Sequence, residues 1–182
     1  MDAFMPMSTT RRHNKIINEL VRKISGIDRF DELDILTSEC ALAHWGSKRK
    51  SNEVCSLVNV ALLEDIEHFA KKIINHLEYV QPDFVLFKNN PFVTNEFETI
   101  TAGCPDLVIE IWSDGNSNAE REFKFSLYSN CGITEHWYIE QDSNEVACYL
   151  GENRLENQFL TDILATRGGL KFDLRYLAIK NK

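Results

Sequence analysis

The run DLVIEIW at residues 106–112 constrains the fold of this 182-residue chain more than any other segment. Runs this rich in Val, Ile and Leu are typical of central strands that are buried on both faces. Side chains alternate along a strand, so Asp106 and Glu110 share one face with Val108 and Trp112. The sequence therefore predicts a central strand with two carboxylates on the same side.

Around this strand, helix-like and strand-like segments follow one another along the chain. Apolar residues at helical spacing predict helices at 11–25, 62–77 and 118–130. Strands are expected at 54–62, 78–88 and 106–112, and a hairpin is expected at 133–141 and 146–154. Residues 28–46 are ambiguous, with short strands as an option, and 89–103 are expected to form a loop that could include an edge strand. Residues 168–177 could form a short strand or a helical turn. No repeat or linker interrupts the pattern, so we expect residues 1–182 to form a single α/β domain.

Composition limits the class of protein. The formal net charge of −8 argues against a non-specific nucleic-acid coat, which would need an excess of Lys and Arg. It leaves room for a nuclease, because a divalent cation can supply local positive charge. No apolar run approaches the ~18–20 residues of a membrane span, and the N-terminus lacks an apolar secretory core. We therefore expect a cytoplasmic protein with no membrane partner.

The cysteines are odd in number and widely spaced, with no CxxC pair. In a reducing compartment such cysteines are expected to be free thiols. A zinc site built on Cys40 and His44 lacks a second ligand pair. The five residues are Cys40, Cys55, Cys104, Cys131 and Cys148.

The two carboxylates of the central strand cannot bind the same cation directly. Asp106 and Glu110 are four residues apart, which is roughly 13 Å along a strand. A neighbouring strand lies only ~4.8 Å away, and Asp83 is in the preceding predicted strand. Asp83, Glu110 and the backbone carbonyl of Ile111 would suit Mg²⁺. The alternative for Glu110 is a hydrated or Arg-paired acid at the open end of the strand.

Lys124 lies in the helix predicted after this strand, with Phe123 and Leu127 on the expected core side. One interpretation is a surface ion pair with Glu120, four residues earlier. In the other, Lys124 reaches back to Glu110, where it could orient an attacking water or stabilise charge on a phosphate.

Taken together, the residues from 81 to 140 resemble the Uma family (Uma-two) of the PD-(D/E)xK nuclease superfamily. The matching positions are Pro82-Asp83, Pro105-Asp106, Glu110, Ser113, Glu120, Lys124, Tyr128, Gly132, Glu135 and Trp137. His13-Asn14 and the GGLKFDL segment fit more weakly. Departures include Ser113-Asp114-Gly115-Asn116 in place of SPST and His136 in place of a Tyr. The helix expected at 62–77 looks like an insertion.

This resemblance implies a restriction-endonuclease-like fold, a central mixed sheet flanked by helices. It also implies a metal-dependent endonuclease that hydrolyses phosphodiester bonds in DNA with Mg²⁺ or Mn²⁺. The metal ligands would be Asp83 and Glu110. Lys124 would be the catalytic lysine. Most members of the superfamily carry this lysine two positions after the Glu, where this chain has Trp112. The supporting residues would be Asp106 and Tyr128, with Glu19 as either an additional acid near the metal or a surface charge.

Two points stay open at the level of sequence. The chain could keep the nuclease fold as a non-catalytic nucleic-acid or protein-interaction module, an alternative that its negative charge and its helical insertion favour. The resemblance also leaves open whether the chain acts alone or as a homodimer.

Overall fold

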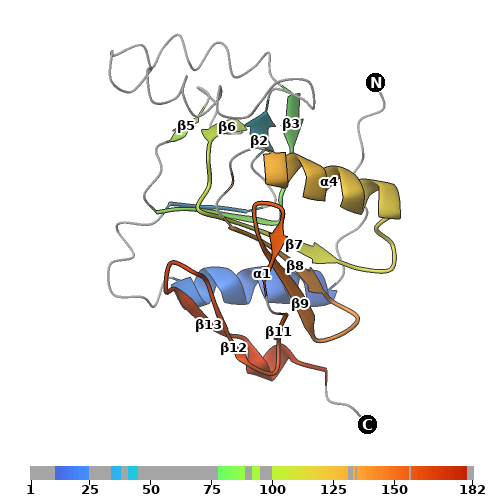
Figure 1. Ribbon diagram of the computed structural model, residues 1–182. Coiled ribbons are helices and arrows are strands. Elements are labelled where there is room, and N and C mark those ends of the chain that lie inside the picture. The colour runs from blue at the N-terminus through green and yellow to red at the C-terminus, as the bar shows by residue number, and fades with distance from the viewer. Residues whose placement is uncertain are drawn as a thin grey trace.

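The computed structural model (Figure 1) describes residues 11–24, 34–37, 41–44, 78–88, 92–94, 100–130, 133, 135–155 and 157–179. In these ranges helix α1 (Arg11–Ile24) covers one face of a central sheet, and helix α4 (Asn118–Asn130) covers the other. The expected α/β architecture, a mixed sheet flanked by helices, is therefore confirmed. The strand predicted at 54–62 and the helix predicted at 62–77 lie outside the described residues. Among the helices that are described, none has the length and apolar character to cross a membrane.

The central sheet has seven strands. Strands β7 (Leu107–Trp112) and β8 (Glu135–Glu140) are parallel, and α4 provides the crossover that a parallel pair needs. The other pairs are antiparallel, including the predicted hairpin of β8 with β9 (Glu145–Leu150). The order is β1 (Asp34–Thr37), β4 (Phe84–Phe87), β7, β8, β9 and β10 (Asn153–Arg154), with β11 (Gln158–Phe159) also paired to β9.

The single strand predicted at 78–88 is wrong, because the structure divides it between two sheets. Its first part is β3 (Glu78–Val80), which belongs to a separate four-stranded sheet, and its second part is β4 of the central sheet. The break falls at Gln81-Pro82-Asp83. Proline has no backbone N–H to donate to a ladder, so it favours a strand boundary. The break leaves Asp83 just before the first residue of β4.

The segments that the sequence left ambiguous contain short strands. The four-stranded sheet has the order β3, β2 (Ala41–His44), β6 (Ile100–Gly103) and β5 (Phe92–Thr94). Near the C-terminus, β12 (Ile163–Ala165) pairs with β13 (Lys171–Asp173), and a 3₁₀ turn, η2 (Arg175–Leu177), follows.

Strand β7 is buried along its whole length, as predicted for a central strand. Its two faces contribute to different cores, in the alternation that a strand imposes. One core contains Leu107, Ile109 and Ile111 with Ile16, Ile17, Leu20 and Ile24 of α1. The other contains Val108 and Trp112 with Leu127 and Tyr128 of α4. Glu110 shares its face with this second group, so its side chain lies on the α4 side of the sheet.

Helix α1 presents one buried stripe to the sheet, at positions spaced three and four apart. Arg22 and Lys23 lie in its last turn, where positive charge complements the helix dipole. The stripe is apolar except at its N-terminal end, where His13 is buried. A polar side chain at a core position needs a partner, and the site described below provides it.

Two details of the sequence interpretation are corrected. Phe123 is 51% exposed rather than buried, because α4 faces the sheet through Leu127 and Tyr128. Cys104 is disulfide-bonded, whereas Cys148 is free and buried as expected. Spacing along the chain cannot reveal which cysteines the fold brings together.

Candidate active site

Asp83 and Glu110 stand at opposing positions of neighbouring strands. The antiparallel register pairs Phe84 of β4 with Ile109 of β7. One residue further along the same register, Asp83 lies opposite Glu110. This is the proximity that the two-carboxylate argument predicted. Glu110 is only 1% exposed, while the side chain of Asp83 is 16% exposed. The pair thus has one deeply buried acid and one acid nearer to solvent.

Both carboxylate oxygens of Glu110 accept hydrogen bonds from α4. Lys124 Nζ lies 2.8 Å from Oε2, and the Tyr128 hydroxyl donates to Oε1. Lys124 and Tyr128 are four residues apart, so they lie on the same side of the helix. Lys124 does not serve as the surface partner of Glu120, whose carboxylate instead accepts a hydrogen bond from Asn116. The geometry predicted for Lys124 is the one found.

Both oxygens of Asp83 also have donors. The backbone N–H of Ile111 donates to Oδ2 at 2.7 Å, and His13 Nε2 lies 2.9 Å from Oδ1. The Lys124 ammonium also donates to the carbonyl of Gln81, two residues before Asp83, at 3.3 Å. The cluster therefore joins α1, the end of β4, β7 and α4.

Burial and the ionic contacts within this cluster shift the pKa values of its groups in opposite directions. Burial, with the nearby charge of Asp83, raises the pKa of Glu110 to about 7, although Lys124 and Tyr128 counteract it. Burial lowers the pKa of Lys124, but the charge and hydrogen bond of Glu110 outweigh it and the pKa is raised. The pKa of His13 is likewise raised, because the contact with Asp83 outweighs burial. Lys124 is thus positively charged at neutral pH beside an acid that titrates there.

This arrangement predicts a pH-dependent stability for the metal-free protein. The pKa of Glu110 is raised from 4.5 to about 7, so between these values the folded state binds more protons than the unfolded state. The free energy of unfolding should therefore fall as pH rises through this window, by on the order of 3 kcal/mol from Glu110. The raised pKa of His13 acts in the same direction, since the stabilisation it gives is lost as pH rises through its folded-state pKa.

Urea unfolding in EDTA between pH 4.5 and 8 measures this effect, with Glu110→Gln as the matched variant. The stability of the wild type should fall relative to that of Glu110→Gln as pH rises. If the variant instead loses stability relative to the wild type, the ion pair with Lys124 outweighs burial and the direction assigned to Glu110 is incorrect.

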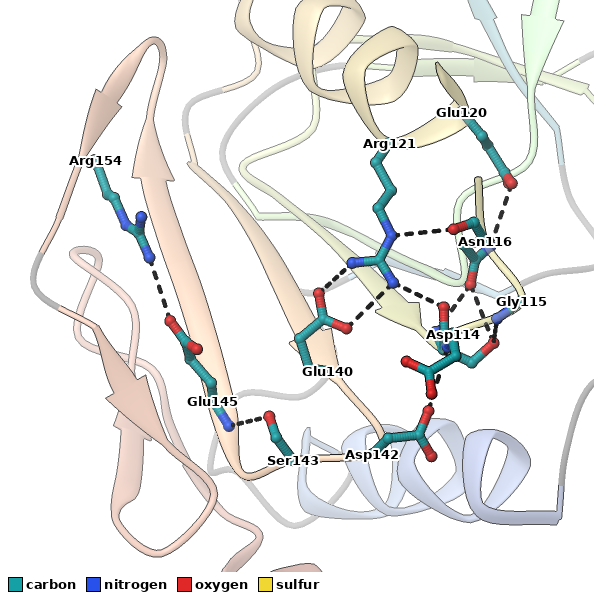
Figure 2. Close-up of polar contacts among 11 residues, drawn as sticks. Asp114, Gly115, Asn116, Glu120, Arg121, Glu140, Asp142, Ser143, Glu145 and Arg154 are labelled. Atoms are coloured by element: carbon teal, nitrogen blue, oxygen red, sulfur yellow. Dashed lines mark hydrogen bonds and ion pairs between the residues drawn. The ribbon is translucent and has the colours of Figure 1, made fainter. Parts of the chain in front are cut away.

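Arg121 holds α4 and the preceding loop against the end of β8 (Figure 2). Its guanidinium pairs with both carboxylate oxygens of Glu140 and donates to the carbonyls of Ser113, at 2.7 Å, and Asn116, at 3.4 Å. It also lies over the ring of Trp112, 4.7 Å from its centroid. Arg121 is three residues before Lys124, so this network fixes the part of α4 that places Lys124 over Glu110.

Sequence reasoning missed the structural importance of Arg121, and it gave His13 only a weak part in the family resemblance. His13 had a detectable signal, because it falls on the same helical stripe as Ile16, Leu20 and Ile24. Arg121 had none, since its partner Glu140 is nineteen residues away and in another element.

Of the other predicted site residues, Asp106 and Glu19 lie away from the cluster, whereas the ring of His136 packs against Tyr128, with 6.1 Å between the ring centroids. Asp106 accepts a hydrogen bond from the backbone N–H of Lys88 at 2.8 Å, at the opposite end of β7 from Glu110. Glu19 pairs with Arg22 at 2.7 Å, as the surface-charge alternative predicted. His136 is buried, with Nδ1 2.9 Å from the Tyr138 hydroxyl and Nε2 2.9 Å from the carbonyl of Gly151. The structure thus brings together Asp83, Glu110, Lys124 and Tyr128 but neither Asp106 nor Glu19.

Comparison with solved structures finds the same fold. A crystal structure of "a putative nuclease belonging to DUF820" from Anabaena variabilis is similar, with a TM-score of 0.59 and 17% sequence identity. The similarity covers 97% of this chain and 86% of that one. Among curated proteins, none matches the sequence.

A family model places these observations in a sequence family. The model described as "Putative restriction endonuclease" matches residues 45–174, which include both acids, Lys124 and Tyr128. The match spans well over half of the chain and agrees with the motif spacing around the cluster. The chain therefore belongs to the Uma2 family.

Proposed function

We propose that this protein is a metal-dependent endonuclease that hydrolyses phosphodiester bonds in DNA. The observation that carries the proposal is the cluster of two acids and a lysine, with Asp83 opposite Glu110 and Lys124 Nζ 2.8 Å from Glu110 Oε2. The family description and the nuclease named in the structural comparison support the same reaction class.

The ligand chemistry fits a hard divalent cation such as Mg²⁺ or Mn²⁺. Such ions take carboxylate and carbonyl oxygens, and Mg²⁺ is usually held by one or two carboxylates with waters and phosphates. Each oxygen of Asp83 and Glu110 has a protein donor, but a carboxylate oxygen keeps a second lone pair for a cation. The Ile111 carbonyl points to the same side of β7 as the Ile111 N–H, which binds Asp83. No third His, Cys, Asp or Glu completes a ligand group within the described ranges.

The chain's own residues would then divide the work of hydrolysis. A cation held by Asp83 and Glu110 would neutralise charge on the scissile phosphate and acidify water. The Lys124 ammonium has three donors, and two contact Glu110 and the Gln81 carbonyl. The third can bind the attacking water or a phosphate oxygen as negative charge develops. Water adds across the P–O bond, and the leaving oxygen takes up the proton.

An activity panel tests this proposal. The wild type is incubated with supercoiled, linear and single-stranded DNA and with RNA, in Mg²⁺, Mn²⁺ or EDTA. We expect cleavage of DNA with either cation and none in EDTA. Glu110→Gln, purified in parallel, controls for contaminating nucleases. Cleavage that is equal in the two preparations, or absent with every DNA substrate, would count against the proposal.

One observation favours the alternative of a non-catalytic module that keeps the nuclease fold. Every carboxylate oxygen of the two acids already has a protein donor, so the cluster is satisfied without a cation. In such a module the acids would be structural, and Mn²⁺ would not bind at Asp83 and Glu110.

A further inference from the structure

His13 is the one polar member of the buried stripe of α1. Its side chain is 9% exposed, and Nε2 lies 2.9 Å from Asp83 Oδ1. His13 and Asp83 are separated by seventy positions in the chain, so only the folded structure brings them together. The residue also precedes the part of the chain that the family model matches, residues 45–174.

The two acids are held from opposite faces of the sheet. α4 supplies both donors to Glu110. α1, which covers the other face of the sheet (Figure 1), supplies His13 to Asp83. The second donor to Asp83 is the Ile111 N–H of β7, on the other carboxylate oxygen. With one donor on each oxygen, the carboxylate plane of Asp83 is fixed. Without His13, the contact at Oδ2 would be the remaining hydrogen bond to this carboxylate among the described residues.

We infer that His13 is a positioning residue, which orients Asp83 for the cation of the proposed function, on which this inference rests. A hydrogen bond to Oδ1 selects one orientation of the carboxylate and leaves a lone pair on each oxygen for the cation. A carboxylate that must be ordered on binding loses conformational entropy, which weakens affinity. Removing the hydrogen-bond partner of a metal ligand typically costs 10–100-fold in metal affinity.

The test is calorimetric titration of Mn²⁺ into the full-length wild type and three variants. His13→Leu continues the apolar stripe of α1 and removes the donor. His13→Gln keeps an amide N–H that can reach Asp83. Asn18→Ala changes an exposed residue of the same helix and is the matched control. Thermal melts in EDTA establish that each variant is folded.

We expect His13→Leu to raise the Kd for Mn²⁺ by about 10–100-fold, while His13→Gln recovers most of the affinity and Asn18→Ala matches the wild type. If His13 had a packing role alone, the Kd for Mn²⁺ would not differ in this way between His13→Leu and His13→Gln. Wild-type affinity in His13→Leu, or equal weakening in Leu and Gln, overturns the role of His13 and leaves the proposed function standing. A wild type that binds no Mn²⁺ overturns both.

Discussion

Lys124→Met should lower the turnover of DNA cleavage by about 10²–10³-fold, the effect of losing a single electrostatic stabiliser. Lys124 Nζ contacts Glu110 Oε2 and the Gln81 carbonyl, and its side chain is 14% exposed. Its charge therefore lies within the cluster rather than on the helix surface. Because a lysine ammonium has no lone pair for a cation, the affinity for Mn²⁺ should change little.

The variant should remain folded. Removing one partner of a buried ion pair is usually strongly destabilising, but Lys124 lowers the pKa of Glu110, so without Lys124 the buried acid takes up a proton more readily. Methionine keeps the length and the apolar stem of lysine, so packing losses are small.

Single-turnover cleavage at saturating Mg²⁺ measures the effect, with Lys171→Met as the control for loss of an exposed lysine elsewhere. If Lys124→Met cleaves DNA at the wild-type rate, Lys124 has a structural role beside Glu110 and none in catalysis.

Glu110→Gln should have the larger effect, with cleavage reduced below that of Lys124→Met. The amide removes one anionic ligand and with it the affinity for a hard cation. It can still accept a hydrogen bond from Lys124 or Tyr128, so the side chain should stay in place. Loss of the buried acid should hold or raise the thermal stability in EDTA at pH 7, where ionised Glu110 is costly in the folded state.

Cleavage rates and thermal melts are measured for the wild type, Glu110→Gln and Glu122→Gln. Because Glu122 is exposed on α4, Glu122→Gln controls for the loss of an acid on the helix surface. Full activity in Glu110→Gln would show that Glu110 takes no part in the reaction.

Much of the fold was predictable because local patterns agree with the tertiary structure. The apolar run of β7 predicts a buried strand, and its alternation assigns Val108 and Ile109 to different cores, as found. The amphipathic pattern of α1 and the turn between β8 and β9 are similarly local. The strand expected at 78–88 was wrong because, although Pro82 marks a strand boundary, the sequence pattern does not show that the chain passes from one sheet to another there.

The candidate site was predictable where spacing fixes geometry. Asp83 and Glu110 follow from neighbouring strands, and Lys124 and Tyr128 follow from one helix face. The contacts of His13 and Arg121 depend on how separate elements pack, which no spacing in the sequence encodes. Trp112 occupies the position two after Glu110 and stacks on Tyr138. The positive charge beside Glu110 therefore comes from Lys124 of α4 and not from β7.

In the proposed function, Asp83 and Glu110 bind one cation between them. Titration of Mn²⁺ into the wild type and Asp83→Asn, followed by electron paramagnetic resonance of the free ion, tests it most directly. We expect one bound Mn²⁺ per wild-type chain, and loss of that binding in a folded Asp83→Asn. Equal binding by the two proteins, or none by the wild type, would contradict it.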